Sequence, residues 1–133
     1  MEKTNSVIRT IHTSRAPMAI GPYSQGVTAG NLVFLSGQLA IDPETGKMVQ
    51  GNIEDRTHQI FKNIRALAKA AGADLDRVVK TTVFLTDMND FAAVNKAYAT
   101  YFEKNPPARS AVQVAALPLG ADIEIESILL LNC

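Results

Sequence analysis

The spacing of hydrophobic positions along this chain predicts two helices. In residues 52–71, NIEDRTHQIFKNIRALAKAA, apolar side chains recur at intervals of three and four, as on a helix with one buried face. Asn52 is suited to cap the start of this helix, and Gly72 to the left-handed position after its end. The same spacing predicts a second helix over residues 89–103, which Pro106 and Pro107 terminate. Its buried stripe consists of Phe91, Val94, Tyr98, Tyr101 and Phe102.

The remaining apolar segments predict strands. Residues 14–31 contain three Gly and two Pro and are expected to form a loop, and residues 42–47 are expected to form a turn. Strands are predicted over residues 6–13, 31–41, 77–86, 109–117 and 122–131, with a short return strand near Met48 and Val49. This order of elements predicts one α+β or α/β domain over residues 1–133, with both helices on one face of a sheet.

The last predicted strand has two distinct faces. Alternation places Glu124, Glu126, Ile128 and Leu130 on one face, and Ile123, Ile125, Ser127 and Leu129 on the other. The strand begins with mixed polarity and becomes apolar on both faces. We therefore expect part of this strand to be buried by a partner outside the chain's own helices, such as another subunit.

Composition narrows the possible partners and compartment. The 133 residues are 47% hydrophobic, and 13 basic residues balance 13 acidic ones, so no overall basic charge favours nucleic acid. No segment is long and apolar enough to predict a membrane span. The single cysteine, Cys133, permits no internal disulfide, and the first residues lack the apolar core of a secretory signal. The expected compartment is the cytoplasm rather than the mitochondrion, because Glu2 argues against a mitochondrial address.

Few residue patterns for familiar catalytic chemistry are present. The two histidines, His12 and His58, have no acid or cysteine at metal-ligand spacing, and we expect both to be solvated. There is no G-x-S-x-G motif for a nucleophilic serine. GPYSQG leads into another strand and is too poor in glycine to hold phosphate. We therefore expect any site to work without a metal or cofactor.

Arg109 and Glu124 are the strongest candidates for a site. Arg109 follows two prolines and precedes apolar positions, which favours the edge of a pocket over a surface ion pair. Its planar donors match a carboxylate with two parallel hydrogen bonds. Glu124 lies between two isoleucines in a neighbouring predicted segment, so it is either exposed, paired with a base such as Arg109, or kept for proton handling.

Two further polar residues have two possible interpretations each. Asn95 falls on the buried stripe of the second predicted helix, where its amide needs a partner from the backbone or from a ligand. Tyr23, in the Gly- and Pro-rich loop, is either a proton donor or a ring that covers the core.

Four segments in order resemble the Rid family of reactive intermediate deaminases, also called YjgF-like and historically L-PSP endoribonuclease. They are GPYSQG, LVFLSGQ, DRVVKTTVFLTDMNDFAAVN and PPARSAVQVAALPLGADIEIE, and the likeness runs from about residue 17 to 128. The resemblance implies a chorismate-mutase-like α+β fold and a homotrimer with clefts between subunits. It also implies hydrolysis of 2-imino acids, such as 2-iminobutanoate and 2-iminopropanoate, to 2-keto acids and ammonia. These imines derive from enamines that pyridoxal phosphate-dependent dehydratases release.

The resemblance also implies residue roles. Arg109 would bind the substrate carboxylate, and Glu124 would hold or activate the attacking water. Tyr23 and Ser36 would line the cleft, Gly37 would allow close approach of backbone, and the second helix would contribute Phe91 and Asn95. Many relatives have a cysteine where this chain has Ala111, so activities that depend on that thiol are not expected here.

Two alternatives of other classes stay open at this point. A protein that binds or senses 2-keto acids without turnover would have almost the same site. A ribonuclease that acts on mRNA and inhibits translation is the other, although the balanced charge and the lack of a placed histidine pair argue against it.

Overall fold

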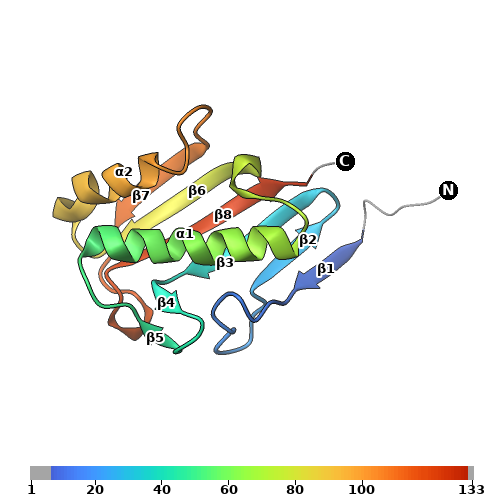
Figure 1. Ribbon diagram of the computed structural model, residues 1–133, viewed down its shortest axis with the longest axis horizontal. Helices are drawn as coiled ribbons and strands as arrows, with labels where there is room; N and C mark the ends of the chain where they lie inside the picture. The colour runs from blue at the N-terminus through green and yellow to red at the C-terminus, as the bar shows by residue number, and fades with distance from the viewer. Residues whose placement is uncertain (1–6, 132–133) are drawn as a thin grey trace.

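The computed structural model describes residues 7–131, which form a mixed six-stranded sheet with two helices on one face (Figure 1). The sheet order is β1-β2-β3-β8-β6-β7, and all neighbours are antiparallel except the parallel pair β6 and β7. The strands are β1 (Ile8–Ile11), β2 (Gly26–Ala29), β3 (Leu32–Gln38), β6 (Val78–Leu85), β7 (Ala108–Gln113) and β8 (Ile123–Leu130). A separate two-stranded ladder consists of β4 (Ile41–Asp42) and β5 (Lys47–Met48). The predicted α+β class is confirmed.

Helix α1 (Ile53–Ala70) begins and ends as its sequence predicts. Asn52 and Asp55 form a reciprocal capping box, in which each side chain accepts a hydrogen bond from the other residue's backbone N–H. Beyond the helix, Gly72 takes the left-handed φ of 89°. The apolar face is fully buried against the sheet through Ile60, Phe61, Ile64, Leu67 and Ala68. Burial of each large side chain contributes about 1.5–3 kcal/mol.

Helix α2 (Phe91–Ala99) is shorter than the predicted span of 89–103. A 3-10 turn, η3 (Met88–Asp90), precedes it, and i→i+3 hydrogen bonds tighten its last turn at Thr100 and Tyr101. The aromatic stripe nevertheless continues past the helix, because Tyr101 and Phe102 both pack on Phe61 with centroid separations of 4.5 and 5.6 Å. A helical spacing of aromatic residues therefore overstated the length of the helix.

The prediction of a continuous loop over residues 14–31 is wrong at its end, because β2 occupies Gly26–Ala29 between β1 and β3. The predicted strand over 31–41 is divided between β3 and β4. Ser6, Cys133 and the first residues used to predict the compartment lie outside the described residues.

The sheet face away from the helices carries incompletely covered apolar side chains among polar ones such as Lys80 and Glu126. Its exposed side chains include Phe34 and Val112, and the neighbouring Ile128 and Leu130 are only half-buried. This is the face on which the sequence predicted that the last strand would need further burial. Within residues 7–131, no helix is long and apolar enough to cross a membrane.

Candidate functional site

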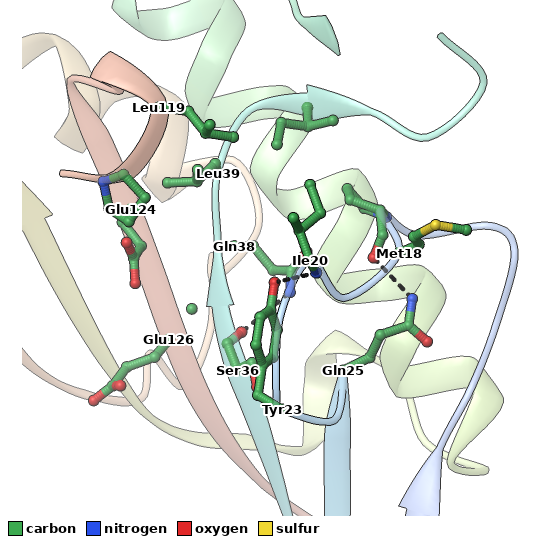
Figure 2. Close-up of a pocket in the computed structure, with 14 residues that line it drawn as sticks. Met18, Ile20, Tyr23, Gln25, Ser36, Gln38, Leu39, Leu119, Glu124 and Glu126 are labelled. Carbon is green, nitrogen blue, oxygen red and sulfur yellow. Dashed lines mark hydrogen bonds between the residues drawn. The ribbon is translucent and has the colours of Figure 1, made fainter. Parts of the chain in front are cut away.

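A cleft with a volume of about 550 Å³ lies where the loop before β2, the end of β3 and the start of β8 meet. Figure 2 shows Glu124 and Glu126 on one side of this cleft, with Tyr23 and Ile20 facing them from the loop. Four of the seven predicted site residues line it: Tyr23, Ser36, Gly37 and Glu124. We call this set the acidic group.

Gly37 makes room for the Glu124 carboxylate. The pairing of β3 with β8 shifts between Leu35 and Gln38, so β3 carries an extra residue in a bulge at this point. A Cβ atom added to Gly37 would overlap Glu124 Oε2 and lie 2.8 Å from Glu124 Cδ. The contact observed at Gly37 is therefore one with the carboxylate of the adjacent strand, and the absence of a side chain at position 37 leaves room for that carboxylate.

The Glu124 carboxyl group is half-buried and makes no ion pair with any residue in the described range 7–131. Burial raises its pKa above the ordinary value, and the nearby negative charge of Glu126 raises the pKa further. A half-buried carboxyl group with a raised pKa holds its proton more readily than an exposed glutamate, and it favours a cationic partner.

Tyr23 and Ser36 are held by hydrogen bonds to the loop. The Ile20 N–H donates to Tyr23 Oη at 3.2 Å, and Ser36 Oγ donates to the Ser24 carbonyl at 2.6 Å. Half of the Tyr23 side chain is exposed to solvent in the cleft. This exposure contradicts the interpretation of Tyr23 as a ring that covers the core, and it presents the phenol to the cleft.

Gln25 anchors the loop before β2, which forms the Tyr23 side of the cleft. This residue was not among the candidates predicted from the sequence. The side chain is buried, and its amide donates to the carbonyls of Thr13 and Pro17 at 3.0 and 2.9 Å. Its Oε1 accepts from the Thr13 N–H at 2.8 Å. The sequence did offer a signal for this role. A Gly- and Pro-rich loop lacks the regular backbone hydrogen bonds of a helix or strand, so a glutamine within it is suited to supply the missing partners.

The remaining predicted residues form a second cluster, the basic group, made of Arg109, Asn95 and Phe91. Arg109 Nη1 donates to Asn95 Oδ1 at 2.7 Å. The guanidinium carbon lies 5.1 Å from the ring centroid of Phe91 and 4.8 Å from that of Tyr98. Asn95 Oδ1 thus has an arginine side chain as its partner, a third kind beside the backbone and ligand partners that the sequence left open. Arg109 makes no ion pair with a described carboxylate and remains exposed, with donors free to bind an anion.

One protomer does not bring the two groups together. In the sheet register, Arg109 on β7 lies opposite Thr81 on β6. Glu124 on β8 lies opposite Phe84, at the other edge of β6. Glu124 points away from the helices, because the alternate residues Ile123 and Ile125 are buried beneath them. Arg109 instead lies against α2. The two segments predicted to be neighbours are separated by β6, and the two functional groups lie on opposite faces of the sheet.

The histidines do not join either group. His12 is exposed, as predicted, whereas His58 is only partly exposed, because its Nδ1 lies 2.6 Å from Tyr101 Oη and the two rings pack together. No group of three or more His, Cys, Asp or Glu side chains in residues 7–131 is arranged to hold a metal ion.

Comparison with known proteins adds relatives that span nearly the whole chain. The family model described as Endoribonuclease L-PSP matches residues 13–130. The mouse protein named 2-iminobutanoate/2-iminopropanoate deaminase is 51% identical over 125 residues, or 93% of this chain and 93% of the mouse protein. The crystal structure of RidA from the Antarctic bacterium Psychrobacter sp. has a TM-score of 0.89 at 50% identity, and the match covers 92% of this chain and 99% of that chain. For Escherichia coli TdcF with bound serine, the TM-score is 0.88 at 42% identity, covering 93% of this chain and 99% of that one.

Proposed function

The chain belongs to the Rid family, whose model carries the description Endoribonuclease L-PSP, and from this premise we propose that it is a 2-iminobutanoate/2-iminopropanoate deaminase. In the reaction, water adds to the imine carbon of R–C(=NH₂⁺)–COO⁻ and the C–N bond then breaks. The products are R–CO–COO⁻ and NH₄⁺, so one water is consumed and no electrons are transferred. A protonated imine is already electrophilic, and this chemistry therefore needs no metal or cofactor to activate the carbon.

The observation that carries the proposal is the division of the candidate residues into two groups. The acidic group lines a cleft, and the basic group displays a free guanidinium on the opposite face of the sheet. Neither group alone can bind an anionic substrate and also handle water. We propose that the protein assembles as a homotrimer of chorismate-mutase-like subunits, in which Arg109 of one subunit completes the cleft of the next. The exposed apolar side chains on the sheet face away from the helices, such as Phe34 and Val112, support this assembly.

Arg109 then binds the substrate carboxylate through paired N–H donors, which fixes the imine carbon in the cleft. Asn95 and Phe91 orient the guanidinium, the first as a hydrogen-bond acceptor and the second through its ring face. Each charge-assisted hydrogen bond contributes about 1.5–3 kcal/mol in a shielded site.

Glu124 positions the attacking water and takes its proton. Burial raises the pKa of Glu124 in the single subunit, and the guanidinium brought by the partner offsets this shift and keeps the carboxylate ionised, so that it can act as a base. In this proposal the Tyr23 hydroxyl, which lines the cleft, donates a proton to the departing nitrogen, and Ser36 lines the same wall. We propose the cytoplasm as the place of action.

A coupled assay tests this function. A pyridoxal phosphate-dependent threonine dehydratase supplies the imine from threonine, and the release of 2-ketobutanoate is followed with and without the protein. The protein should accelerate release above the uncatalysed rate, and Arg109→Ala should not. If wild-type protein binds 2-ketobutanoate yet leaves the rate of its release unchanged, the deaminase assignment fails and a binding or sensing role replaces it.

A further inference from the structure

The cleft has an apolar rim that the proposed chemistry does not use. Met18, Ile20 and Leu119 all line the cleft, yet their side chains are 77%, 70% and 68% exposed. Exposed large apolar side chains gathered in one place mark a surface that binds something apolar. Figure 2 shows Leu119 beside Leu39 on the Glu124 side of the cleft, with Ile20 and Met18 on the facing loop.

Leu119 is held in an unusual backbone conformation. Its φ of 58° and ψ of 26° lie in the left-handed region, and it is the one non-glycine residue with positive φ within residues 7–131. Leucine rarely adopts this conformation, because its Cβ crowds the following carbonyl. The turn η4 (Pro118–Gly120) imposes it through the hydrogen bond from the Ala121 N–H to the Pro118 carbonyl at 3.1 Å.

This strain does not serve to bury the side chain, since Leu119 remains mostly exposed. Glycine or asparagine would satisfy the same turn with less steric cost. A strained residue whose side chain projects over a binding cleft is a candidate for function rather than for packing.

We propose that Leu119 is a specificity-determining residue that, with Ile20 and Met18, forms an apolar subsite for the aliphatic side chain of the imino acid. This inference rests on the proposed deaminase function and names which substrates that site prefers. With the carboxylate bound by Arg109 and the imine carbon near Glu124, the substrate's R group is left to face the apolar rim. The carboxylates of Glu124 and Glu126 in the same cleft disfavour imino acids with acidic side chains.

The test compares two imino acids that differ only in R. An L-amino acid oxidase generates the imine of alanine, with a methyl side chain, or that of leucine, with an isobutyl side chain, and kcat/KM for hydrolysis is measured for each. In Leu119→Asn and Leu119→Gly, kcat/KM for the leucine-derived imine should fall roughly four- to tenfold, because each buried methylene contributes about fourfold. The value for the alanine-derived imine should stay within about twofold of wild type. Both replacements tolerate positive φ, so folding is preserved.

Ile8→Asn is the matched control, because Ile8 is also a mostly exposed aliphatic residue but does not line the cleft. It should change neither value. An unchanged leucine-to-alanine ratio in the Leu119 variants overturns the subsite. So does an equal loss for both substrates together with a changed oligomeric mass, which would make Leu119 a subunit contact. If wild-type protein hydrolyses neither imine, the proposed function itself fails.

Discussion

The Glu124 carboxylate occupies the space that a side chain at Gly37 would need. This contact joins two adjacent strands at the bulge in β3, and it constrains the direction in which the Glu124 carboxylate points. The glycine is therefore required by the position of a functional group and not by a left-handed backbone.

Replacing Gly37 with alanine should displace the Glu124 carboxylate while leaving the fold intact. The atom that must move is the end of a flexible side chain, so the cost in stability is small. Misplacement of a catalytic group lowers kcat by about 10- to 100-fold. Steady-state kinetics and thermal unfolding check this, and the double variant Gly37→Ala/Glu124→Asp, with its shorter acid, should recover part of the loss. A variant with full kcat would show that the position of the carboxylate is unimportant.

The raised pKa of Glu124 predicts how the free energy of unfolding depends on pH. Burial favours the protonated acid, so the ionised form of Glu124 costs stability in the folded chain at pH 7. In an Arg109→Ala background, which removes the compensating cation, adding Glu124→Gln should raise the free energy of unfolding at pH 7. The gain should vanish as pH falls below the ordinary carboxyl pKa of 4.5, where both states are protonated.

Urea unfolding at pH 7 and pH 3, at equal protomer concentration, measures this difference. A Gln variant that is less stable than its parent at pH 7 would contradict the stated electrostatics of the cleft.

Asn95 should act on binding through Arg109. In Asn95→Ala the guanidinium loses its acceptor at 2.7 Å and its fixed orientation. KM for the imino acid should rise about three- to tenfold with little change in kcat, which corresponds to the loss of one hydrogen bond. Arg109→Lys keeps the charge but not the planar donors, and it should raise KM at least as much. A change in kcat alone, with KM unaltered, would contradict the proposal that Asn95 orients the Arg109 guanidinium for binding.

Gln25 should control the stability of the cleft wall. Gln25→Leu leaves the Thr13 N–H and the carbonyls of Thr13 and Pro17 without their partner, which costs about 2–4 kcal/mol. Limited proteolysis should then cut the loop near Arg15, and kcat should fall because Tyr23 lies on the same loop. The exposed Gln50 offers a control, in which the same replacement should change neither property. Equal protease resistance in both variants would contradict the anchoring role.

Local signals in the sequence predicted the parts of the fold that depend on neighbouring residues. Asn52 and Asp55 cap α1 through contacts within one turn, and Gly72 ends it, so both boundaries could be found without knowledge of the tertiary structure. The strand β2 was missed because its four residues follow a segment rich in Gly and Pro, and because its pairing partners β1 and β3 supply its stability.

Contacts that depend on sheet order could not be predicted from local pattern. Arg109 and Glu124 seemed to lie on adjacent segments, but the parallel pairing of β7 with β6 places a strand between them. The contact between Asn95 and Arg109 likewise requires α2 to lie against the β7 edge. The sequence therefore identified the residue types of the candidate site, but it did not predict that they lie on opposite faces of the sheet.

Mixed trimers test the central claim, that Arg109 and Glu124 act together across a subunit boundary. Protomers carrying Arg109→Ala and protomers carrying Glu124→Ala, with different affinity tags, are co-expressed and purified through both tags. Each homotrimer should be inactive as a deaminase. Every doubly tagged trimer contains one boundary at which an intact Glu124 meets an intact Arg109, so these trimers should show about one third of wild-type activity. Mixed trimers as inactive as either parent would contradict the shared site.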